Sequence, residues 1–460
     1  MKHRNEKGFM LIATSFLIVV LTAFSAMTLF RSINEAKAVE REVDRLKTYC
    51  AAEAGLQGAF SEIAGTSYIG YINTSDYGPT DLYMNGEKVS DCHATKMLVS
   101  DNCVIVQSTG NGIYSTRSYE ARIYLESLLS KYFLFTDSED FATGQWAQYG
   151  TPLKDPVTGE DAVDANGRVR VAEDDYDRAL MYFKGNWTIQ GENVSLYGNA
   201  YAEGSLDINS NKSLDAHGDT YVAGEYIETG DLIVDDTWDD GEDKHPLTED
   251  EREGELPTLD FTFYQNHNAI PSFGTAANAR YIEFIVTAEG QNVVNEYNNS
   301  NYSNLIASYN IPDTCIIYVN GDAYVKGTIN GRVCLVASDD VHIQGSLEYQ
   351  DTGFADQGHS AAWLAWDKIY YNNPEMTICG IFYAHGISKS NPHHDAAYTT
   401  EGTYDPESKQ YINVVGNRIM KGNTNLGHYA HRLYTWDPYL RKYPPPGLPV
   451  TAMVASVREI

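Results

Sequence analysis

The sequence has few basic residues for its size. Lys and Arg together number 33 in 460 residues, against 63 Asp and Glu, so 33 − 63 gives a formal net charge of −30. A protein that holds nucleic acid by its phosphates needs a basic face that releases counterions. The sparse and scattered basic residues argue against such a partner, and we expect the chain to bind no nucleic acid.

Several short motifs of enzymes and cofactor sites are also missing. The six cysteines include no Cys-x-x-Cys pair, which leaves a zinc ribbon or thioredoxin-like chemistry without support. The chain has no glycine loop ending in Lys-Ser or Lys-Thr and no Gly-x-Ser-x-Gly motif. Nucleotide-binding and esterase functions are therefore not indicated. We predict neither a cofactor nor a catalytic residue.

The residues that are present favour strands. Hydrophobic residues make up 43% of the chain, enough for a large core and too many for general disorder. Tyr supplies 34 of the 55 aromatic residues and Gly occupies 37 positions, a mixture that suits half-exposed strands joined by turns. The composition therefore predicts a mainly β fold.

The N-terminus contains one long apolar run. Phe9 to Phe30 comprises 22 residues without charge, preceded by Lys2, Arg4 and Lys7. This length spans a bilayer as a helix, and the basic leader predicts a cytoplasmic N-terminus with the rest of the chain outside the cytoplasm. A secretory signal peptide cleaved near residues 23–25 is the first alternative, but the apolar run before that point is longer than usual.

The residues after the apolar run keep a helical period. Ile33, Val39 and Leu46 lie near one face, charged residues occupy the others, and no proline interrupts the segment. One helix is therefore expected to run to about residue 64, as a rod of roughly 80 Å. A signal anchor followed by a coiled-coil stalk would fit this pattern as well.

Two stretches of this region resemble a known family. Lys7-Gly8-Phe9-Met10-Leu11-Ile12 resembles the class III signal of type IV pilins and pseudopilins, and residues 49–56 are similar to the AxxAAEAGL helix of PilX-type minor pilins. The resemblance implies that a prepilin peptidase cuts between Gly8 and Phe9 and that the new amine of Phe9 is methylated. It also implies a pilin-like helix packed on a small antiparallel sheet.

The sequence departs from major pilins at one position. Ala13 stands where those proteins carry a Glu, five residues into the mature chain. The resemblance therefore favours a tip, priming or accessory subunit over a bulk filament subunit. The partners it implies are the prepilin peptidase, other pilins or pseudopilins through the helix, and membrane lipid before assembly. The location it implies is the bacterial inner membrane and, after assembly, a pilus or the cell surface.

Residues 66–130 have a strand-like pattern with one hairpin signal, Asn111-Gly112 between two alternating runs. Cys92 and Cys103 close a short loop in a space that permits oxidation, so they form the best candidate for a disulfide. Cys334 and Cys379 lie in apolar runs and are expected to be small core residues.

A six-residue phrase recurs after residue 130, with an acid or Asn at its start and Gly at its end. It occupies residues 186–191, 199–204, 219–224, 322–327 and 340–345. Repeats of about 20 residues with short strands indicate a β-solenoid, in which each coil covers the next, and the adjacent copies of this phrase are spaced on that scale. We expect Ala323 and Val325 to stack on Val341 and Ile343, and a β-sandwich or meander is the alternative.

These patterns divide the chain into a leader at 1–8, a transmembrane segment at 9–30, a helical stalk with a small antiparallel sheet at 31–130, and a right-handed β-helical head at 131–450. Residues 231–260 are expected to form an acidic loop, because 231–255 contains twelve acids and two bases. The head resembles uncharacterised β-helical pilus-assembly heads that follow PilX-like N-termini.

Three groups in the head could carry chemistry. Asp322, Asp339, Asp340 and Lys326 could form a polysaccharide-cleaving site, although Asp before a strand more often caps a turn. His359, His385, His393, His394 and Asp395 contain metal-ligating types, but their spacing matches no metal motif. Residues 162–173 only partly match an EF-hand loop, since Ala162 replaces its first acid, and a plain hairpin explains them better. We therefore predict no metal site.

The sequence as a whole indicates a minor pilin or pseudopilin in a type IV pilus or type II secretion assembly, with a head whose ligand is not specified. A membrane-anchored β-helix that binds or cleaves carbohydrate is the alternative from the enzyme class. A self-polymerising solenoid that needs no secretion machinery is a third possibility, and it predicts an uncut N-terminus.

Overall fold

The computed structural model divides the chain into two compact units, described separately below. Unit 1 comprises residues 1–66, 72–124 and 452–460, and unit 2 comprises residues 67–71 and 125–451. We refer to unit 2 as the head. The residues that the structure describes are 3–84, 87–100, 102–143, 147–151, 158, 160–162, 179–192, 194–228, 231–234, 256–350, 355, 358–372, 376–386, 398–399, 411–421, 424–425 and 431–460.

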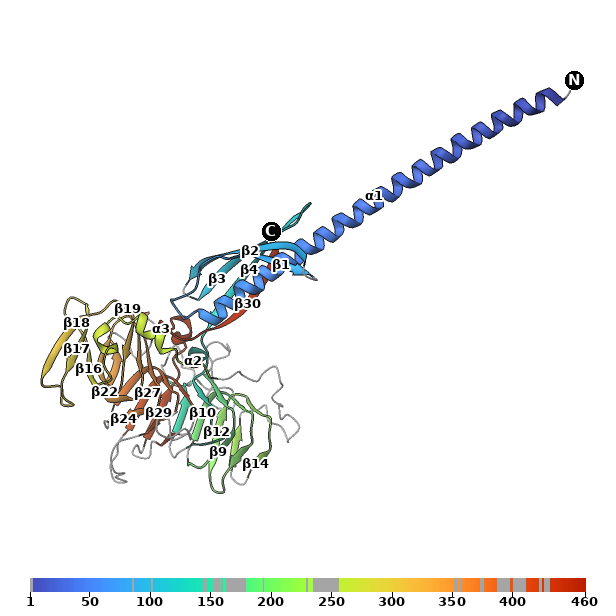
Figure 1. The fold of residues 1–460 in the computed structure, drawn as a ribbon. Helices are drawn as coiled ribbons and strands as arrows, with labels where there is room; N and C mark the ends of the chain where they lie inside the picture. The colour runs from blue at the N-terminus through green and yellow to red at the C-terminus, as the bar shows by residue number, and fades with distance from the viewer. Residues whose placement is uncertain are drawn as a thin grey trace. The chain divides into compact units, whose positions relative to one another are not determined.

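Unit 1 begins with one uninterrupted helix, α1, from His3 to Thr66. Its 64 residues contain no proline, and at 1.5 Å per residue they extend over about 96 Å. The expected end near residue 64 is confirmed. Figure 1 shows the first half of α1 extending beyond the sheet on which its second half packs.

A five-stranded sheet covers the second half of α1. Its strands are β1 (Tyr77–Met84), β2 (Glu87–Ser100), β3 (Cys103–Asn111), β4 (Thr116–Glu126) and β30 (Thr451–Glu459), in the order β1-β2-β3-β4-β30. β3 and β4 form an antiparallel hairpin in which Asn111 lies opposite Thr116. The hairpin predicted at Asn111-Gly112 is confirmed.

The last strand of the chain joins this sheet, which no pattern in the sequence indicated. β30 lies at the sheet edge beside β4, where the Ile460 N–H donates to the Ser118 carbonyl over 3.0 Å. Arg458 pairs with Glu120 and Glu459 pairs with Arg117. Because β4 and β30 are neighbours in the sheet, residues 125–451 of the head are an insertion between two adjacent strands of unit 1, whereas residues 67–71 of the head lie between α1 and β1 in the sequence.

The head is built almost entirely from short strands. Its first group is β5 (Leu134–Thr136), β6 (Asp140–Thr143), β7 (Ala147–Gly150), β8 (Ala179–Phe183), β9 (Asn186–Ile189), β10 (Val194–Ala202), β11 (Leu206–Ile208), β12 (Ser213–His217), β13 (Thr220–Val222), β14 (Tyr226–Glu228) and β15 (Asp231–Val234). Its second group is β16 (Arg280–Val286), β17 (Asn292–Tyr297), β18 (Leu305–Asn310), β19 (Thr314–Val319), β20 (Ala323–Ile329), β21 (Arg332–Ala337), β22 (Val341–Tyr349), β23 (Ser360–Ala365), β24 (Ile369–Tyr371), β25 (Met376–Ala384), β26 (Tyr398–Thr399), β27 (Tyr411–Met420), β28 (Thr424–Asn425) and β29 (His431–Thr435). The short helices are α2 (Leu128–Lys131), α3 (Phe261–Asn266), η2 (Pro271–Gly274) and α4 (Tyr439–Lys442).

Parallel pairing joins strands that lie one repeat apart in the second group. Ala323 of β20 lies opposite Val341 of β22, which lies opposite Ile369 of β24. Val325 likewise lies opposite Ile343, and these inward side chains are fully buried. The predicted stacking of Ala323 and Val325 on Val341 and Ile343 is confirmed. Pairing in parallel is not what an antiparallel sandwich or meander would use.

The first group repeats the same arrangement, with paired residues one coil apart in the sequence. Ala200 of β10 lies opposite Thr220 of β13, and Leu206 of β11 lies opposite Tyr226 of β14. β6, β9, β11 and β14 form a separate parallel sheet, whereas the other paired strands of the head close into a barrel with additional parallel pairings. The mainly β fold with a long N-terminal helix is confirmed, and the right-handed β-helix (solenoid) stays a prediction.

The two groups join in the middle of the stack. β27 pairs in parallel with β5, and β29 pairs in parallel with β7, so the last coils of the head lie against its first ones. At the far end of the second group, β16 pairs in parallel with β20 and antiparallel with β17, and β17 pairs with β18. This antiparallel segment terminates the parallel stack on that side.

One predicted boundary in the head needs correction. The acidic loop predicted at 231–260 begins with a strand, since Asp231–Val234 forms β15, whose residues pair in register with Ser213–Ala216 of β12. Leu232, Ile233 and Val234 give this segment strand-forming side chains, which the count of acids obscured. Residues 235–255 lie outside the described part of the chain.

Glycines allow paired strands of the head to approach each other closely. Gly416 of β27 has a φ of +128°, and a Cβ built on it would lie 2.1 Å from the carbonyl oxygen of Gly380 in β25. Gly416 and Gly380 are register partners in neighbouring coils. No L side chain fits this position without backbone movement.

We predict that Gly416→Ala lowers the free energy of unfolding of the head by more than about 2 kcal/mol, because it adds backbone strain and a clash between coils. Gly274→Ala is the control, since its Cβ would meet its nearest neighbours at an ordinary 3.4 Å. Thermal unfolding followed by circular dichroism measures both variants. Equal stability of the two would contradict the observed approach of β27 to β25.

Candidate functional site

The first half of α1 presents apolar side chains on all its faces. Met10, Phe16 and Phe30 are each at least 70% exposed within the chain. Among the described residues, α1 is the one helix long and apolar enough to cross a membrane. A surface of this kind is unfavourable in water and suits lipid or neighbouring apolar helices.

Polar side chains within the apolar run bond back to the helix. Thr14 donates to the Met10 carbonyl and Thr22 to the Ile18 carbonyl, each over 2.6 Å. Thr28 donates to the Ser25 carbonyl over 2.9 Å. These hydroxyls therefore need no water, which makes the segment compatible with a hydrocarbon environment. Directly after the run, a salt bridge joins Arg31 to Glu35 over 2.9 Å.

The predicted processing residues Gly8 and Phe9 lie within α1, near its start. Ala13, the position at which major pilins carry Glu, is exposed on the same helix. Its methyl group offers no charge to a neighbouring amine.

Small residues bring the second half of α1 close to the sheet. Ala51, Ala52 and Ala59 are fully buried, and a Cβ on Gly110 of β3 would lie 2.2 Å from the Thr48 carbonyl oxygen. The stretch that resembles the AAEAGL helix therefore forms the contact between helix and sheet within this chain. Its alanines exclude larger side chains that would hold the two elements apart.

A buried carboxylate fixes the turn between β3 and β4 on α1. Asp44 accepts hydrogen bonds from the Ile113 N–H (2.7 Å), the Tyr114 N–H (2.9 Å) and the Ser115 hydroxyl (2.8 Å). Burial opposes ionisation, but these bonds together hold the pKa of Asp44 below its usual value of 3.8. No signal in the sequence pointed to this role, because Asp44 is one acid among several on an amphipathic helix.

A second ion pair fixes the other end of the contact. The Lys96 amine lies 2.6 Å from a Glu62 carboxylate oxygen, and the Lys96 side chain has no exposed surface. Five helical turns, about 27 Å along the helix axis, separate Asp44 from Glu62. The sheet is thus held to α1 by polar contacts about 27 Å apart along the helix.

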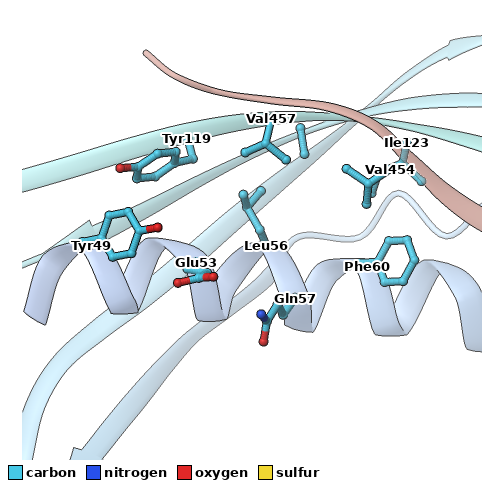
Figure 2. Close-up of a pocket in the computed structure, with 10 residues that line it drawn as sticks. Tyr49, Glu53, Leu56, Gln57, Phe60, Tyr119, Ile123, Val454 and Val457 are labelled. Atoms are coloured by element: carbon cyan, nitrogen blue, oxygen red, sulfur yellow. The ribbon is translucent and has the colours of Figure 1, made fainter. Parts of the chain in front are cut away.

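An apolar groove lies between α1 and the edge of the sheet. Figure 2 shows Tyr49, Glu53 and Phe60 of α1 facing Tyr119 of β4 and Val454 and Val457 of β30. Its volume is about 420 Å³, and Glu53 is the acidic residue in its lining. The groove has one charged group among mostly apolar side chains, so it offers no constellation for acid–base or nucleophilic catalysis.

The predicted Cys92–Cys103 disulfide is wrong. Both residues are free thiols, and the register places Cys92 opposite Gly110 and Cys103 opposite Ser100. Eight residues of β2 therefore separate their positions, about 26 Å along the strand, whereas a disulfide needs Cα atoms within about 7 Å. The segment between the two cysteines runs along β2 to the turn, so Cys103 lies at the turn of the β2–β3 hairpin and Cys92 lies far from it. Cys334 and Cys379 are fully buried free thiols, as expected of core residues.

The acidic candidates of the head come together without Lys326. Asp322, Asp339 and Asp340 gather with Asp367 and His342 in two overlapping groups of potential ligand atoms. Lys326 instead lies 3.1 Å from Glu283 and 4.0 Å from the centre of the Tyr302 ring. Sequence analysis missed Asp367 and His342. Asp367 lies two residues after the end of β23, just as Asp339 lies two residues after the end of β21, the strand with which β23 pairs.

The predicted histidine candidates do not gather in the described part of the chain. The Nδ1 atom of His359 accepts a hydrogen bond from the Gly331 N–H over 2.7 Å, and His385 is buried with its ring stacked on Trp366 at 4.4 Å. Neither belongs to a group of metal-ligating side chains among the described residues. His393, His394 and Asp395, and most of the EF-hand-like stretch at 162–173, lie outside those residues.

Comparisons with known proteins give little further information. No family model matches the chain, and no curated protein matches it. Among solved structures, the crystal structure of the competence-associated pilin ComZ from Thermus thermophilus is similar at 12% sequence identity and a TM-score of 0.28, over 90% of this chain and 97% of that one. A TM-score this low does not establish a shared fold.

We predict that Asp44→Asn destabilises unit 1 at pH 7 and flattens its acid response. A carboxylate with a lowered folded-state pKa stabilises the fold above its unfolded pKa of about 3.9, and this stabilisation is lost as pH falls through the folded value. Thermal unfolding of the detergent-solubilised chain between pH 7 and pH 3 measures the effect. Glu42→Gln, at an exposed position, is the control. An unchanged acid slope in Asp44→Asn would contradict this role.

Proposed function

We propose that this chain is a minor pilin or pseudopilin that takes part in a type IV pilus or type II secretion assembly. The observation that carries the proposal is the construction of unit 1. One continuous helix carries an uncharged, mainly apolar run at residues 9–30, while its second half is held to an antiparallel sheet by Asp44 and by the Lys96–Glu62 ion pair. A subunit made to move from lipid into a bundle of apolar helices needs both parts.

Processing would convert the precursor into an assembly-competent form. A prepilin peptidase would cut after Gly8, and methylation of the Phe9 amine would follow. The short basic leader is removed while the apolar run remains, so the mature chain stays in the bacterial inner membrane with its N-terminus on the cytoplasmic side. These steps rest on the resemblance of residues 7–12 to the class III signal.

Assembly would place the apolar run of α1 among the helices of other pilins. Ala13 cannot supply the carboxylate that pairs with a neighbouring amine in major pilins, which supports an accessory or terminal position rather than bulk incorporation. The head, a right-handed β-helix in this proposal, would be carried outside the cytoplasm. Its main segment, residues 125–451, is inserted between the adjacent strands β4 and β30, so the chain leaves the small sheet and returns to it on either side of that segment.

A structural role for the head has support from its aspartates. Asp322 accepts from the Asp340 N–H (3.3 Å) and Asp340 from the Lys368 N–H (2.9 Å), so these carboxylates cap successive coils. The carbohydrate alternative would need exposed aromatic faces, but Tyr281, Tyr324, His342 and Tyr370 form one continuous stack with their faces against each other. We therefore propose a structural component rather than an enzyme.

We predict that the chain loses its first eight residues only in cells with an active prepilin peptidase. Mass spectrometry of the N-terminal peptide should find a methylated Phe9 in those cells and an intact leader in cells without the enzyme. Gly8→Val should block the cut, because a branched side chain replaces the small residue before the cleaved bond. Gly65→Val, in open space at the far end of α1, should be processed normally.

Retention of the leader in the wild-type chain, in cells where a known prepilin is cut, would reject the pilin assignment. The same result would leave a signal-anchored head and make carbohydrate binding the next function to test.

A further inference from the structure

Five metal-ligating side chains converge on one corner of the second strand group. Ligand atoms of Asp322, Asp340 and His342 all lie within 4.8 Å of one another, and the same holds for Asp339, Asp340 and Asp367. Asp340 belongs to both groups, so it links them. The convergence follows from the parallel register, in which Asp322 and Asp340 immediately precede the paired residues Ala323 and Val341.

The histidine of this group is held rigidly. His342 is 4% exposed, and its ring stacks between Tyr324 at 4.1 Å and Tyr370 at 4.5 Å, with interplanar angles of 9° and 4°. The two flanking rings restrict tilting of the imidazole, and one of its nitrogens lies within 4.8 Å of carboxylate oxygens of Asp322 and Asp340. This ring adds a nitrogen donor to what would otherwise be a set of acids alone.

The imidazole of His342 also has a polar neighbour that can fix its tautomer. Nδ1 of His342 lies 3.4 Å from the side-chain amide nitrogen of Asn372, while the amide oxygen of Asn372 is buried without a hydrogen-bond partner among the described residues. Flipping this amide, so that its oxygen and nitrogen exchange places, lets the oxygen accept from Nδ1–H and makes Nε2 the nitrogen with the lone pair. Metal-bound histidines almost always donate their second N–H in this manner.

Structural capping does not explain the charge at this corner. In the first strand group, the equivalent contact between coils is made by neutral side chains. Asn199 accepts from the Asp219 N–H over 3.1 Å, and Asn186 accepts from the Ser205 N–H over 2.9 Å. An amide is therefore sufficient to cap a coil, yet the second group uses carboxylates and crowds four of them together.

The crowding has an electrostatic consequence at the shared residue. Asp340 belongs to both ligand groups, and the carboxylates of Asp322, Asp339 and Asp367 lie close enough to it for their like charges to repel. A bound cation would remove the repulsion among these carboxylates. The combination of carboxylate oxygen and imidazole nitrogen suits first-row divalent ions such as Zn²⁺, whereas Ca²⁺ prefers oxygen alone.

We propose that Asp322, Asp340 and His342 form a binding site for a divalent transition metal, Zn²⁺ being the representative ion, with Asp339 and Asp367 beside it. The ion would link the paired strands β20, β22 and β24, because its ligands lie at or just before the start of these strands. Nothing in this proposal depends on N-terminal processing, so it stands or falls separately from the pilin assignment.

The test uses the full chain in detergent, stripped with a chelator and titrated with Zn²⁺ or Ca²⁺ by calorimetry. We expect Zn²⁺ to bind with at least tenfold higher affinity than Ca²⁺ and to raise the unfolding temperature. His342→Phe keeps an aromatic ring in the stack and removes the nitrogen donor, and Asp340→Asn keeps an acceptor for the Lys368 N–H and removes the charge. Each should weaken Zn²⁺ binding at least tenfold.

His217→Phe is the matched control. His217 is also a buried histidine that stacks on a tyrosine, Tyr197 at 4.8 Å, and it lies 3.2 Å from Asp215, but among the described residues it belongs to no ligand group. Its replacement should leave Zn²⁺ affinity unchanged. Equal Zn²⁺ affinity in the wild type, His342→Phe and Asp340→Asn would overturn the proposal, as would Ca²⁺ binding that needs Asp340 but not His342.

X-ray absorption at the zinc edge of the wild-type chain covers the case in which a variant fails to fold. We expect one imidazole and oxygen neighbours at about 2.0–2.2 Å and no sulfur. A sulfur neighbour, or a spectrum without imidazole, would place the ion elsewhere and contradict the site.

Discussion

Parallel pairing of β27 with β5 is the interaction on which the rest of the head depends. Arg418, Ile419 and Met420 lie opposite Leu134, Phe135 and Thr136, and the buried Asn417 amide donates to the Leu129 carbonyl over 2.9 Å. This pairing places the last strands of the second group beside the first strands of the first group. The segment 125–451 therefore begins and ends in neighbouring strands. The chain can then leave the small sheet at β4 and return to it as the adjacent strand β30.

Local patterns in the sequence predicted local structure well. The continuous helix, the hairpin at Asn111-Gly112 and the register of Ala323 on Val341 each depend on spacings of a few residues to about one repeat. Long-range pairings had no comparable signal. The pairing of β30 with β4 joins strands that residues 127–450 separate in the sequence, and no pattern in the sequence indicated it. The disulfide prediction failed for the same reason, since it took proximity in sequence for proximity in space.

The two strand groups of the head use the same type of capping hydrogen bond, but the acceptor is an amide in the first group and a carboxylate in the second. Side chains at the start of each coil accept a backbone N–H from the next coil, through Asn186 and Asn199 in the first group and through Asp322 and Asp340 in the second. Sequence reasoning recognised the capping role of the aspartates. It did not find Asp367 beside them, because the repeat that supplies Asp367 is longer than the preceding one, and it did not count His342 among the candidate ligands. Placing Asp367 in the candidate site therefore needed the pairing of β23 with β21 and of β24 with β22, which the three-dimensional structure supplies.

We propose a subunit whose helix α1 joins a filament and whose head is displayed from it. Membership of that filament is the central claim. The most direct measurement is quantitative mass spectrometry of sheared, purified filaments from the native host, with this chain counted against the major pilin. Peptides from both unit 1 and the head are expected in the filament fraction, at a small fraction of the major pilin. Recovery of the chain only in the membrane fraction, with normal filaments that lack it, would contradict the claim.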